Sequence, residues 1–392
     1  MTVARAYLDH NATSPLRPQA REAMIAALTE GGNPSSVHAS GRGARGRLEA
    51  ARAQVARLTG ASARGVVFTS SATEANTLAL HPAWDIAGHP VTCDVLLTSA
   101  VEHVAVLNGH RFAPEAVEIL PVDALGRIDL AVLAARLEAH AAAGRRAMVS
   151  LMLANNETGV IQPVAEAARL AHAHGAVVHC DAVQGAGRLD LDINALGVDL
   201  LSLSAHKIGG PQGAGALVAA SADTRSRAPL LSGGGQERGQ RGGTQNVPAI
   251  AGFGAAALCA LEDLHGESSR LAHLRDGLEQ EIVAAIPETM VVGAGASRLA
   301  NTTCIAFGGL KAETLVIALD LSHVMVSAGS ACSSGKVGSS HVLSAMGVES
   351  GLASGAIRLS LGWSSTQQDV DMALAALRRV VPQVRSRSLR AA

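Results

Sequence analysis

The chain contains few lysines and few cysteines and has almost no net charge, and these features limit the partners, the compartment and the kinds of site that can be expected. Its formal net charge of −1 gives no overall attraction to nucleic acid or to an anionic membrane. The N-terminal residues contain no apolar signal core, and no apolar run reaches membrane-spanning length. The cysteines form an odd, dispersed set without metal-ligand or CxxC spacing, which suits a reducing compartment: Cys93, Cys180, Cys259, Cys304 and Cys332. We therefore expect a cytoplasmic protein with no metal site, no membrane contact and no direct nucleic-acid partner.

What is present is typical of an α/β enzyme. Of 392 residues, 48% are hydrophobic and 41 are glycine, which is enough apolar material for two domains with many tight turns. Between residues 60 and 220, short apolar runs alternate with helix-length segments. This alternation predicts a mostly parallel sheet with helices on both faces.

A second, smaller α+β domain is predicted from a change of pattern near residue 256. Two long helices, 256–264 and 268–285, are expected there and are followed by strands. The last helix is expected over 367–381, ending at Pro382 before a disordered basic tail. The predicted domains are 15–255 and 256–392, the second of them joined by segment 1–14.

Lys207, one of only three lysines, follows the apolar run 200–203. A lysine at the mouth of an apolar strand can lose its proton when it is desolvated, and it then attacks carbonyl compounds as an amine. Most lysines are solvated surface residues. Here, however, Ser204 and His206 crowd the same turn, and a carboxylate stands upstream. We therefore predict a reactive lysine.

The upstream carboxylate is Asp181, which ends the buried-strand pattern 176–181. A lysine and an aspartate at the ends of neighbouring strands are what a pyridoxal phosphate site needs. The lysine forms the Schiff base, and the aspartate keeps the pyridine nitrogen protonated so that the ring accepts electrons. Asp181 alone would as readily be a helix N-cap. The pair is far more specific than either residue.

With these residues, the chain resembles the pyridoxal-phosphate-dependent cysteine desulfurases of the NifS/IscS kind, within the class V aminotransferase group. The matching motifs run in the family's order and at similar spacing from Tyr-Leu-Asp at 7–9 to Ile-Arg-Leu-Ser-Leu-Gly at 357–362. The resemblance implies fold type I of these enzymes, an α/β fold with a mostly parallel sheet in the large domain and a smaller α+β domain. His-Asn-Ala-Thr at 10–13 departs from the family's Asn-Ala-Ala-Thr, and neither segment 7–13 nor loop 31–38 is assigned a role.

The hydroxyl-rich turn 70–76 leads from a strand into a helix. Backbone N–H groups at a helix N-terminus bind anions such as phosphate, although ordinary capping residues give the same pattern. The resemblance implies that Ala72, through its backbone, and Thr73 contact the cofactor phosphate. Ser204 and His206 are further candidates for cofactor binding.

Three other polar residues gain roles from the resemblance, and each has a structural alternative. His103 would stack on the pyridoxal ring and shuttle protons, although a histidine just past a strand is more often structural. Asn156 would bind the ring and the substrate carboxylate, although an Asn-Asn pair before glycine is usually a turn. Gln184 would donate a hydrogen bond to the phenolic oxygen of the ring.

The glycine-rich stretch 233–246 is predicted to be irregular. A flexible surface loop is one interpretation. In the resembled family this segment reaches the other subunit, which would place Thr244 at the partner's cofactor phosphate. The resemblance thus implies a homodimer with shared active sites.

Cys332 lies in a glycine- and serine-rich loop after a strand, and Arg358 lies within an apolar strand. A loop thiol is a nucleophile where its thiolate is favoured, and is otherwise unreactive. Ala-Gly-Ser-Ala-Cys at 328–332 matches the family's Ser-Gly-Ser-Ala-Cys signature, which implies that Cys332 is the nucleophile. The guanidinium fork of Arg358 suits either an internal salt bridge or a substrate carboxylate, and the resemblance implies the latter.

The implied activity is cysteine desulfuration. L-Cysteine would displace Lys207 from the cofactor, and Cys332 would attack the substrate sulfur, leaving L-alanine and a persulfide. That sulfur would pass to an acceptor such as an iron–sulfur scaffold, for cluster assembly or tRNA thiolation. A selenocysteine lyase or a related aminotransferase would use the same cofactor apparatus, and an aminotransferase would not need Cys332. Lys207, Asp181 and Cys332 together argue against a third alternative, a non-catalytic protein that docks on a scaffold.

Overall fold

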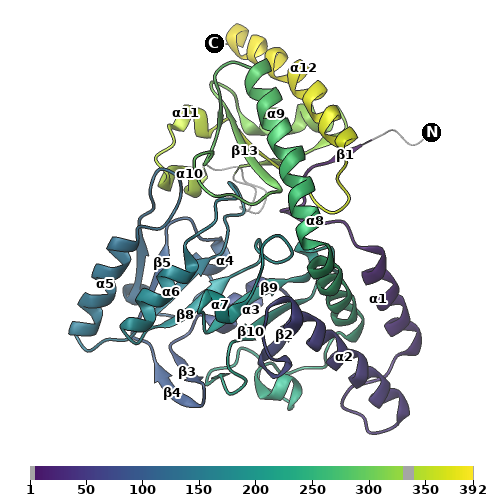
Figure 1. The fold of residues 1–392 in the computed structure, drawn as a ribbon, viewed down its shortest axis with the longest axis vertical. Helices are drawn as coiled ribbons and strands as arrows, with labels where there is room; N and C mark the ends of the chain where they lie inside the picture. Colours follow the sequence, from purple (N-terminus) through teal and green to yellow (C-terminus); the bar gives the residue numbers. More distant parts are fainter. Residues whose placement is uncertain (1–4, 330–339, 392) are drawn as a thin grey trace.

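The computed structural model describes residues 5–329 and 340–391. Figure 1 shows a larger and a smaller sheet, each with its own helices, stacked along the long axis of the molecule. The long helix α8 (Val247–Ala285) packs on helices of both parts.

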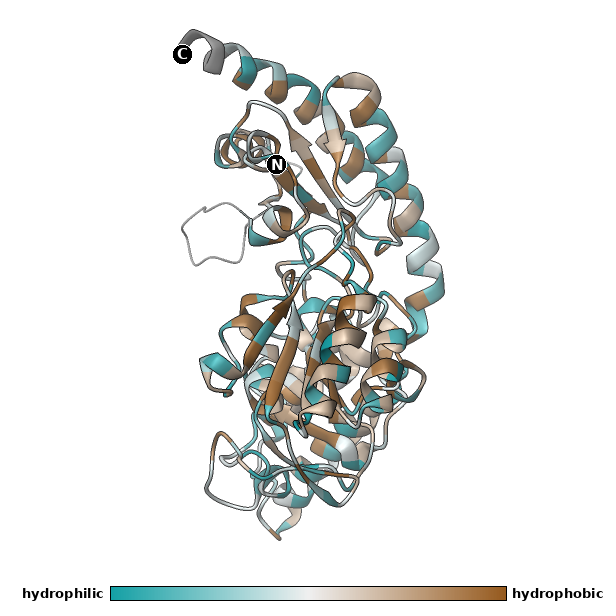
Figure 2. Cartoon of the chain, turned by 90° about the vertical axis from the view of Figure 1, so that its left-hand side faces the viewer, coloured by the Kyte–Doolittle hydropathy of each residue, from teal (hydrophilic) through white to brown (hydrophobic). Residues whose placement is uncertain are grey.

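The larger sheet has seven strands in the order β2-β10-β9-β8-β7-β5-β6. All neighbouring pairs are parallel except those of β10, which is antiparallel to both of its neighbours. Apart from the edge strand β6, the strands are almost entirely buried, and Figure 2 shows them as the apolar centre of this part. This confirms the predicted mostly parallel α/β sheet. The strands are β2 (Val66–Thr69), β5 (Val95–Ser99), β6 (Val117–Leu120), β7 (Ala147–Met152), β8 (Val177–Asp181), β9 (Leu200–Ser204) and β10 (Gly215–Ala219).

The helices of this part cover the sheet through apolar stripes. Helix α6, for example, buries Val164, Ala167, Ala168 and Ala171, which lie three or four residues apart and therefore on one helix face. A separate antiparallel sheet has the order β11-β3-β4. Its strands and the helices before α8 are β3 (Ala83–Ile86), β4 (His89–Thr92), β11 (Arg225–Ser226), α1 (Pro18–Glu30), α2 (Ala39–Leu58), α3 (Ala72–Ala79), α4 (Val104–Leu107), α5 (Leu130–Ala142), α6 (Val164–Ala173) and α7 (Ile193–Leu196).

The smaller part contains an antiparallel sheet in the order β12-β13-β16-β15. Strand β1 (Ala6–Tyr7) joins this part by pairing in parallel with β14 (Val324–Met325). Its remaining elements are β12 (Thr289–Val291), β13 (Thr302–Phe307), β15 (Ser327–Ala328), β16 (Ala356–Ser360), α9 (Ala312–Asp320), α10 (His341–Ala345), α11 (Ser350–Ala353) and α12 (Gln367–Ala391).

Two helix predictions were wrong. The helices expected at 256–264 and 268–285 are one helix, α8, so the predicted domain boundary lies inside it. A single internal glycine, Gly266, costs a helix only about 1 kcal/mol, and buried Leu264 and Leu271 hold the helix on both sides of it. The last helix also continues through Pro382 to Ala391, because its buried stripe extends past the proline to Val384.

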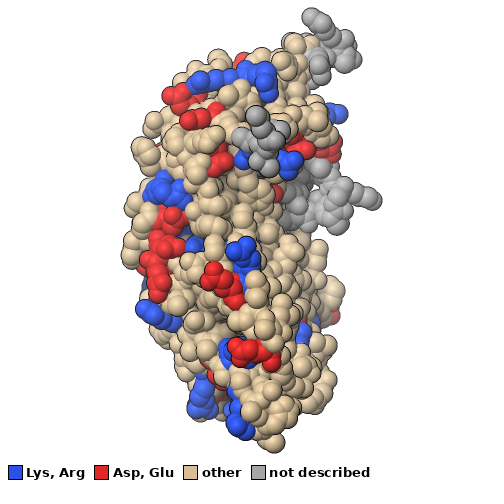
Figure 3. Space-filling model, turned by 90° about the vertical axis from the view of Figure 1, so that its right-hand side faces the viewer, with Lys and Arg blue, Asp and Glu red and all other residues tan. Residues whose placement is uncertain are grey.

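Helix α8 also corrects the expectation that no apolar run reaches membrane-spanning length. Among the described residues, it alone is long and apolar enough to cross a bilayer, judged by length and composition. However, 56% of the apolar window is buried inside the protein, as in a core helix. On the face shown in Figure 3, basic and acidic side chains of the described residues are interspersed, which agrees with the small net charge.

Candidate active site

The parallel strands of the larger sheet end at one edge, and a cavity of about 430 Å³ lies there. In an open α/β sheet, ligands bind in the crevice beyond the carboxyl ends of the strands. The smaller sheet supplies the opposite wall through β15 and β16. Ten of the residues singled out in the sequence line this cavity: Ala72, Thr73, His103, Asn156, Asp181, Gln184, Ser204, His206, Lys207 and Arg358.

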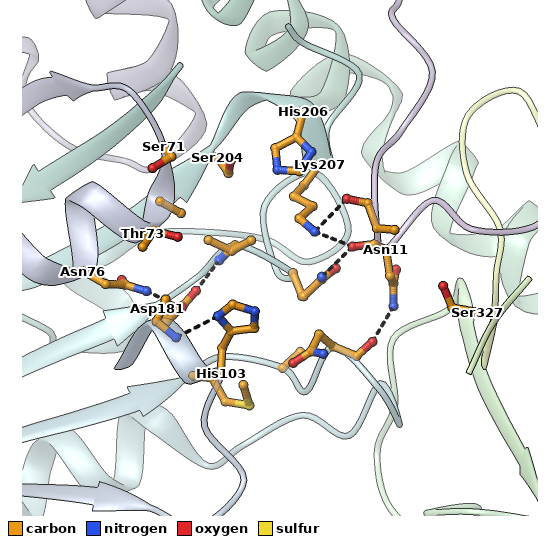
Figure 4. A pocket seen from close by; sticks show the side chains of 18 of the residues that line it. Asn11, Ser71, Thr73, Asn76, His103, Asp181, Ser204, His206, Lys207 and Ser327 are labelled. Carbon is orange, nitrogen blue, oxygen red and sulfur yellow. Dashed lines mark hydrogen bonds between the residues drawn. The ribbon is translucent and has the colours of Figure 1, made fainter. Parts of the chain in front are cut away.

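Lys207 ends the short 3₁₀ turn Ala205–Lys207 that follows β9. Its Nζ donates to the carbonyl oxygens of Asn11 at 2.5 Å and Ala12 at 2.9 Å. The amine thus reaches the N-terminal segment across the cavity, as Figure 4 shows. Beside it, burial and the charge of Lys207 lower the pKa of His206 to about 4, so the His206 ring is neutral at neutral pH.

Asp181 is the last residue of β8, and both of its carboxylate oxygens are held. Oδ2 accepts from Asn76 Nδ2 at 2.7 Å, and Oδ1 accepts from the backbone N–H of Val183 at 3.1 Å. Because these donors fix the carboxylate plane, the side chain presents a directed negative charge to the cavity.

The N-terminus of α3 forms a third wall. The first N–H groups of a helix have no acceptor within it, so those of Ala72 and Thr73 are suited to an anion. A glycine in β10 allows this turn to approach the sheet: a Cβ on Gly215 would lie 2.4 Å from the carbonyl carbon of Ser71. Figure 4 places Ser71 and Thr73 on the side of the cavity opposite Asn11 and Ser327.

His103 follows β5 and caps α4, accepting at Nδ1 from the backbone N–H of Ala105 at 3.1 Å. Burial lowers the pKa of His103 and outweighs the negative charge of Asp181, which raises it; Lys207 and His341 lower it further. The neutral ring therefore carries its proton on Nε2. The adjacent Glu102 is fully buried, and burial raises its pKa to about 8, so this carboxyl group is protonated at neutral pH.

Arg358, on β16, is only 1% exposed. Its Nη2 donates to Asp9 Oδ1 at 2.7 Å, and its Nη1 donates to the backbone carbonyl of Asn156 at 3.0 Å. The internal salt bridge considered as an alternative thus exists, while Nε is buried without a partner among the described residues. The guanidinium is thus held at the cavity wall.

Two predicted residues are not placed in this cavity. Thr244 is exposed and lies outside the lining, in the chain between the 3₁₀ turn Gln236–Gly239 and α8. Cys332 lies outside the described residues. Ser327, a few residues before it in the sequence, lines the cavity.

Comparisons with known proteins agree with this geometry. The family described as aminotransferase class-V matches residues 6–373. The chain belongs to the class-V aminotransferase family. It is 45% identical to a cysteine desulfurase of Cereibacter sphaeroides, over 98% of this chain and 97% of that protein. It is also 41% identical to an IscS-like cysteine desulfurase of Mycobacterium tuberculosis, over 99% of each chain. A structure of a NifS-like protein from Rickettsia africae superposes with a TM-score of 0.85, at 35% identity, over 97% of this chain and all of that one.

These relatives confirm the resemblance to cysteine desulfurases of the NifS/IscS type within the class-V aminotransferases. The family is pyridoxal-phosphate-dependent, and the cavity fits that cofactor chemically. Lys207 offers an amine for the aldehyde, Asp181 a carboxylate for the ring nitrogen, and the start of α3 a cradle for the phosphate. Asn76 Oδ1 is in addition a buried acceptor without a partner among the described residues.

Sequence reasoning missed several residues of this class-V aminotransferase site. Asp9 and Asn11 line the cavity, although no role was assigned to the segment at 7–13. Asn76 was missed because a polar residue inside a helix gives no signal of its own, yet it lies one helical turn after Ala72 and faces Asp181. Ser327 could have been found only from the register of β15 opposite Arg358.

Proposed function

We propose that this chain is a pyridoxal-phosphate-dependent cysteine desulfurase that converts L-cysteine to L-alanine and passes the sulfur on through Cys332. The observation that carries the proposal is the meeting of Lys207, Asp181 and the N-terminus of α3 around one cavity. Arg358 on the facing wall adds a site for the carboxylate of an amino acid.

The larger part of the protein would hold the cofactor. Lys207 would bind its aldehyde carbon, Asp181 its ring nitrogen, and Ala72 and Thr73 its phosphate, with His103 against the ring. Gln184 would donate to the phenolic oxygen, with Ser204 and His206 completing the wall beside Lys207. The bound cofactor supplies an electron sink for the pair left when the α-proton of the substrate is removed.

Arg358 and Asn156 would orient the substrate. Arg358 lines the cavity, and a carboxylate is the anion that a guanidinium fork binds best. Lys207 Nζ would serve as the base for the α-proton of the substrate. The neutral ring of His103, with its proton on Nε2, would give up that proton and take it back.

The sulfur step is a transfer between two sulfur atoms. The thiolate of Cys332 attacks the substrate sulfur, an S–S bond forms, and the substrate C–S bond breaks. The electron pair of that bond remains on carbon, and a proton completes the methyl group of L-alanine. The sum is therefore one thiol and L-cysteine giving one persulfide and L-alanine, with no external oxidant.

The decisive experiment measures alanine and sulfide release from L-cysteine with an added thiol, for the wild type and for Cys332→Ala. We expect release by the wild type and none by the variant. Cys259→Ala is the matched control, because Cys259 is a partly buried thiol on α8 outside the cavity lining. Equal alanine release by wild type and Cys332→Ala would favour the selenocysteine lyase. Full activity of Lys207→Ala without bound cofactor would refute the mechanism.

The assembly is part of the proposal. In a homodimer, the exposed Thr244 of each subunit would reach the cofactor phosphate of the other. The persulfide would serve a cytoplasmic acceptor protein, such as an iron–sulfur scaffold or a tRNA-thiolation factor. Sedimentation of the holoenzyme tests the dimer, and Thr244→Val should weaken cofactor retention without changing the subunit fold.

A further inference from the structure

Arg188 lies outside the lining of the cavity and forms no ion pair with an acidic side chain of the described residues. It follows Gln184 by four residues, in the turn after β8, and is partly buried. Its acceptors are all neutral: Nη1 donates to the backbone carbonyl of Gln184 at 3.1 Å and to the Gln184 side-chain Oε1, and Nη2 lies 3.5 Å from the backbone carbonyl of Lys207. No carboxylate of the described residues pairs with this guanidinium. An arginine in such a place needs an explanation, because burying an unpaired cation is costly.

The contact with Oε1 determines which way the Gln184 amide faces. Since Arg188 can only donate, the oxygen of the amide must point toward it, and the NH₂ group must point away. One N–H of Gln184 Nε2 then reaches the backbone carbonyl of Asn11 at 3.1 Å. The same carbonyl accepts from Lys207 Nζ at 2.5 Å. The second N–H of Gln184, which lines the cavity, remains for a ligand.

Arg188 keeps its charge in this position. Burial and the positive charge of Arg358 lower the pKa of Arg188 to about 9, so the group is still protonated at neutral pH. Arg188 and Lys207 also line a second, small cavity of about 40 Å³ on the far side of the lysine. The other charged or titratable groups near Lys207 and Arg188 are Asp9, His10, Arg17, His103, Asp181, His206, Asp263, Glu267, Arg270 and Arg358.

We propose that Arg188 is a positioning residue that locks the amide of Gln184 with an N–H directed into the cavity, toward the phenolic oxygen of the cofactor. The inference rests on the proposed function, since it names how that cofactor would be tuned. A donor at this oxygen stabilises its negative charge and so weakens its hold on the proton at Lys207 Nζ. Without Arg188, the Gln184 amide is free to turn its oxygen toward the cavity, where it would repel the phenolic oxygen.

The test is a pH titration of the visible absorbance of the holoenzyme without substrate, which reports the proton at Lys207 Nζ. Arg188→Met should raise the midpoint of the titration by about one pH unit, a tenfold change in the protonation equilibrium. Arg188→Lys, which keeps a donor and the charge, should restore most of the wild-type midpoint. The matched control is Arg111→Met: Arg111 is half-buried, donates to the backbone carbonyl of Thr77, and touches neither Gln184 nor Lys207.

A double variant separates positioning from the bare charge. If Arg188 acts through Gln184, then Arg188→Met should cause little further shift in a Gln184→Leu background. A full shift in that background would overturn the positioning role, and so would an unchanged midpoint in Arg188→Met or an equal shift in Arg111→Met. If the wild type binds no pyridoxal phosphate, the proposed function fails instead, so the two failures are distinguishable.

Discussion

The ion pair between Asp9 and Arg358 should be a measurable source of both stability and substrate affinity. Its side chains are 20% and 2% exposed, and the N–O distance is 2.7 Å. Removing one partner of a fully buried pair costs about 3–5 kcal/mol, because the other charge is left unpaired. Water reaches Asp9, so we expect Asp9→Asn to cost about 2–3 kcal/mol, and Arg358→Met about the same.

The pair should also be non-additive. In a protein that lacks Arg358, replacing Asp9 breaks no ion pair and costs little further stability. The double variant should therefore lose about 1–2 kcal/mol less free energy of unfolding than the two single variants lose together. Urea unfolding of the apoprotein at fixed pH gives the change in free energy of unfolding for the two single variants and the double variant, without a contribution from bound cofactor. Additivity within about 0.5 kcal/mol would refute the reasoning, because it would mean that the two groups do not interact.

A matched pair elsewhere separates stability from function. Arg298 and Glu279 form a comparable pair, 7% and 13% exposed at 2.7 Å, outside the cavity lining. Glu279→Gln should therefore destabilise the protein but leave the KM for L-cysteine unchanged. Asp9→Asn should raise that KM several-fold, since the guanidinium that we propose binds the substrate carboxylate loses the carboxylate that holds it. Equal KM values for the two variants would show that Asp9 has only a structural role.

Three further outcomes are expected. Burial raises the pKa of Glu157 to about 7 from its ordinary 4.5; the folded state therefore binds the extra proton between these values and loses stability as pH rises through them. Between pH 4.5 and pH 7 the free energy of unfolding should therefore fall by about 3 kcal/mol more in the wild type than in Glu157→Gln, which can be measured by unfolding the apoprotein at a series of pH values. Gly215→Ala should force the Ser71 turn away, at a cost of about 1–3 kcal/mol, and weaken cofactor binding, whereas Gly233→Ala meets nothing within 4 Å and should do neither. Asp181→Asn should release pyridoxal phosphate at least about tenfold more readily in dialysis, with an unchanged far-ultraviolet spectrum.

The sequence was most informative where a strand ends in an unusual polar residue. Asp181 ends a buried strand, and Lys207 and His103 each come shortly after one. Because parallel strands end at one edge, their meeting could be predicted. Arg358 was found because an arginine is conspicuous in an apolar strand, but its partner Asp9 is separated from it by 349 residues and has no local signal.

Other features depended on long-range packing, which local patterns do not report. Arg188 looks like an ordinary surface arginine in the sequence, and only the folded chain brings its fork against Gln184 and Lys207. Likewise Gly266 and Pro382 read as helix breakers, yet both helices continue because buried residues on either side hold them in place. Glycine and proline have low helix propensity, but at these two positions tertiary contacts override it.

The pairing of β1 with β14, together with the Asp9–Arg358 contact, has a consequence for synthesis on the ribosome. Strand β1 and Asp9 are synthesised first, but their partners, β14 and Arg358, come more than 300 residues later in the sequence. Arg358 is 349 residues after Asp9, so at a translation rate of about 5–20 residues per second it is synthesised roughly 20–70 s later. The carbonyl groups of Asn11 and Ala12, which accept hydrogen bonds from Lys207, belong to the same N-terminal segment as Asp9. A nascent chain can therefore assemble its larger sheet early, but it cannot complete the cavity, whose lining includes Ser327 and Arg358, until almost all of the protein has been made.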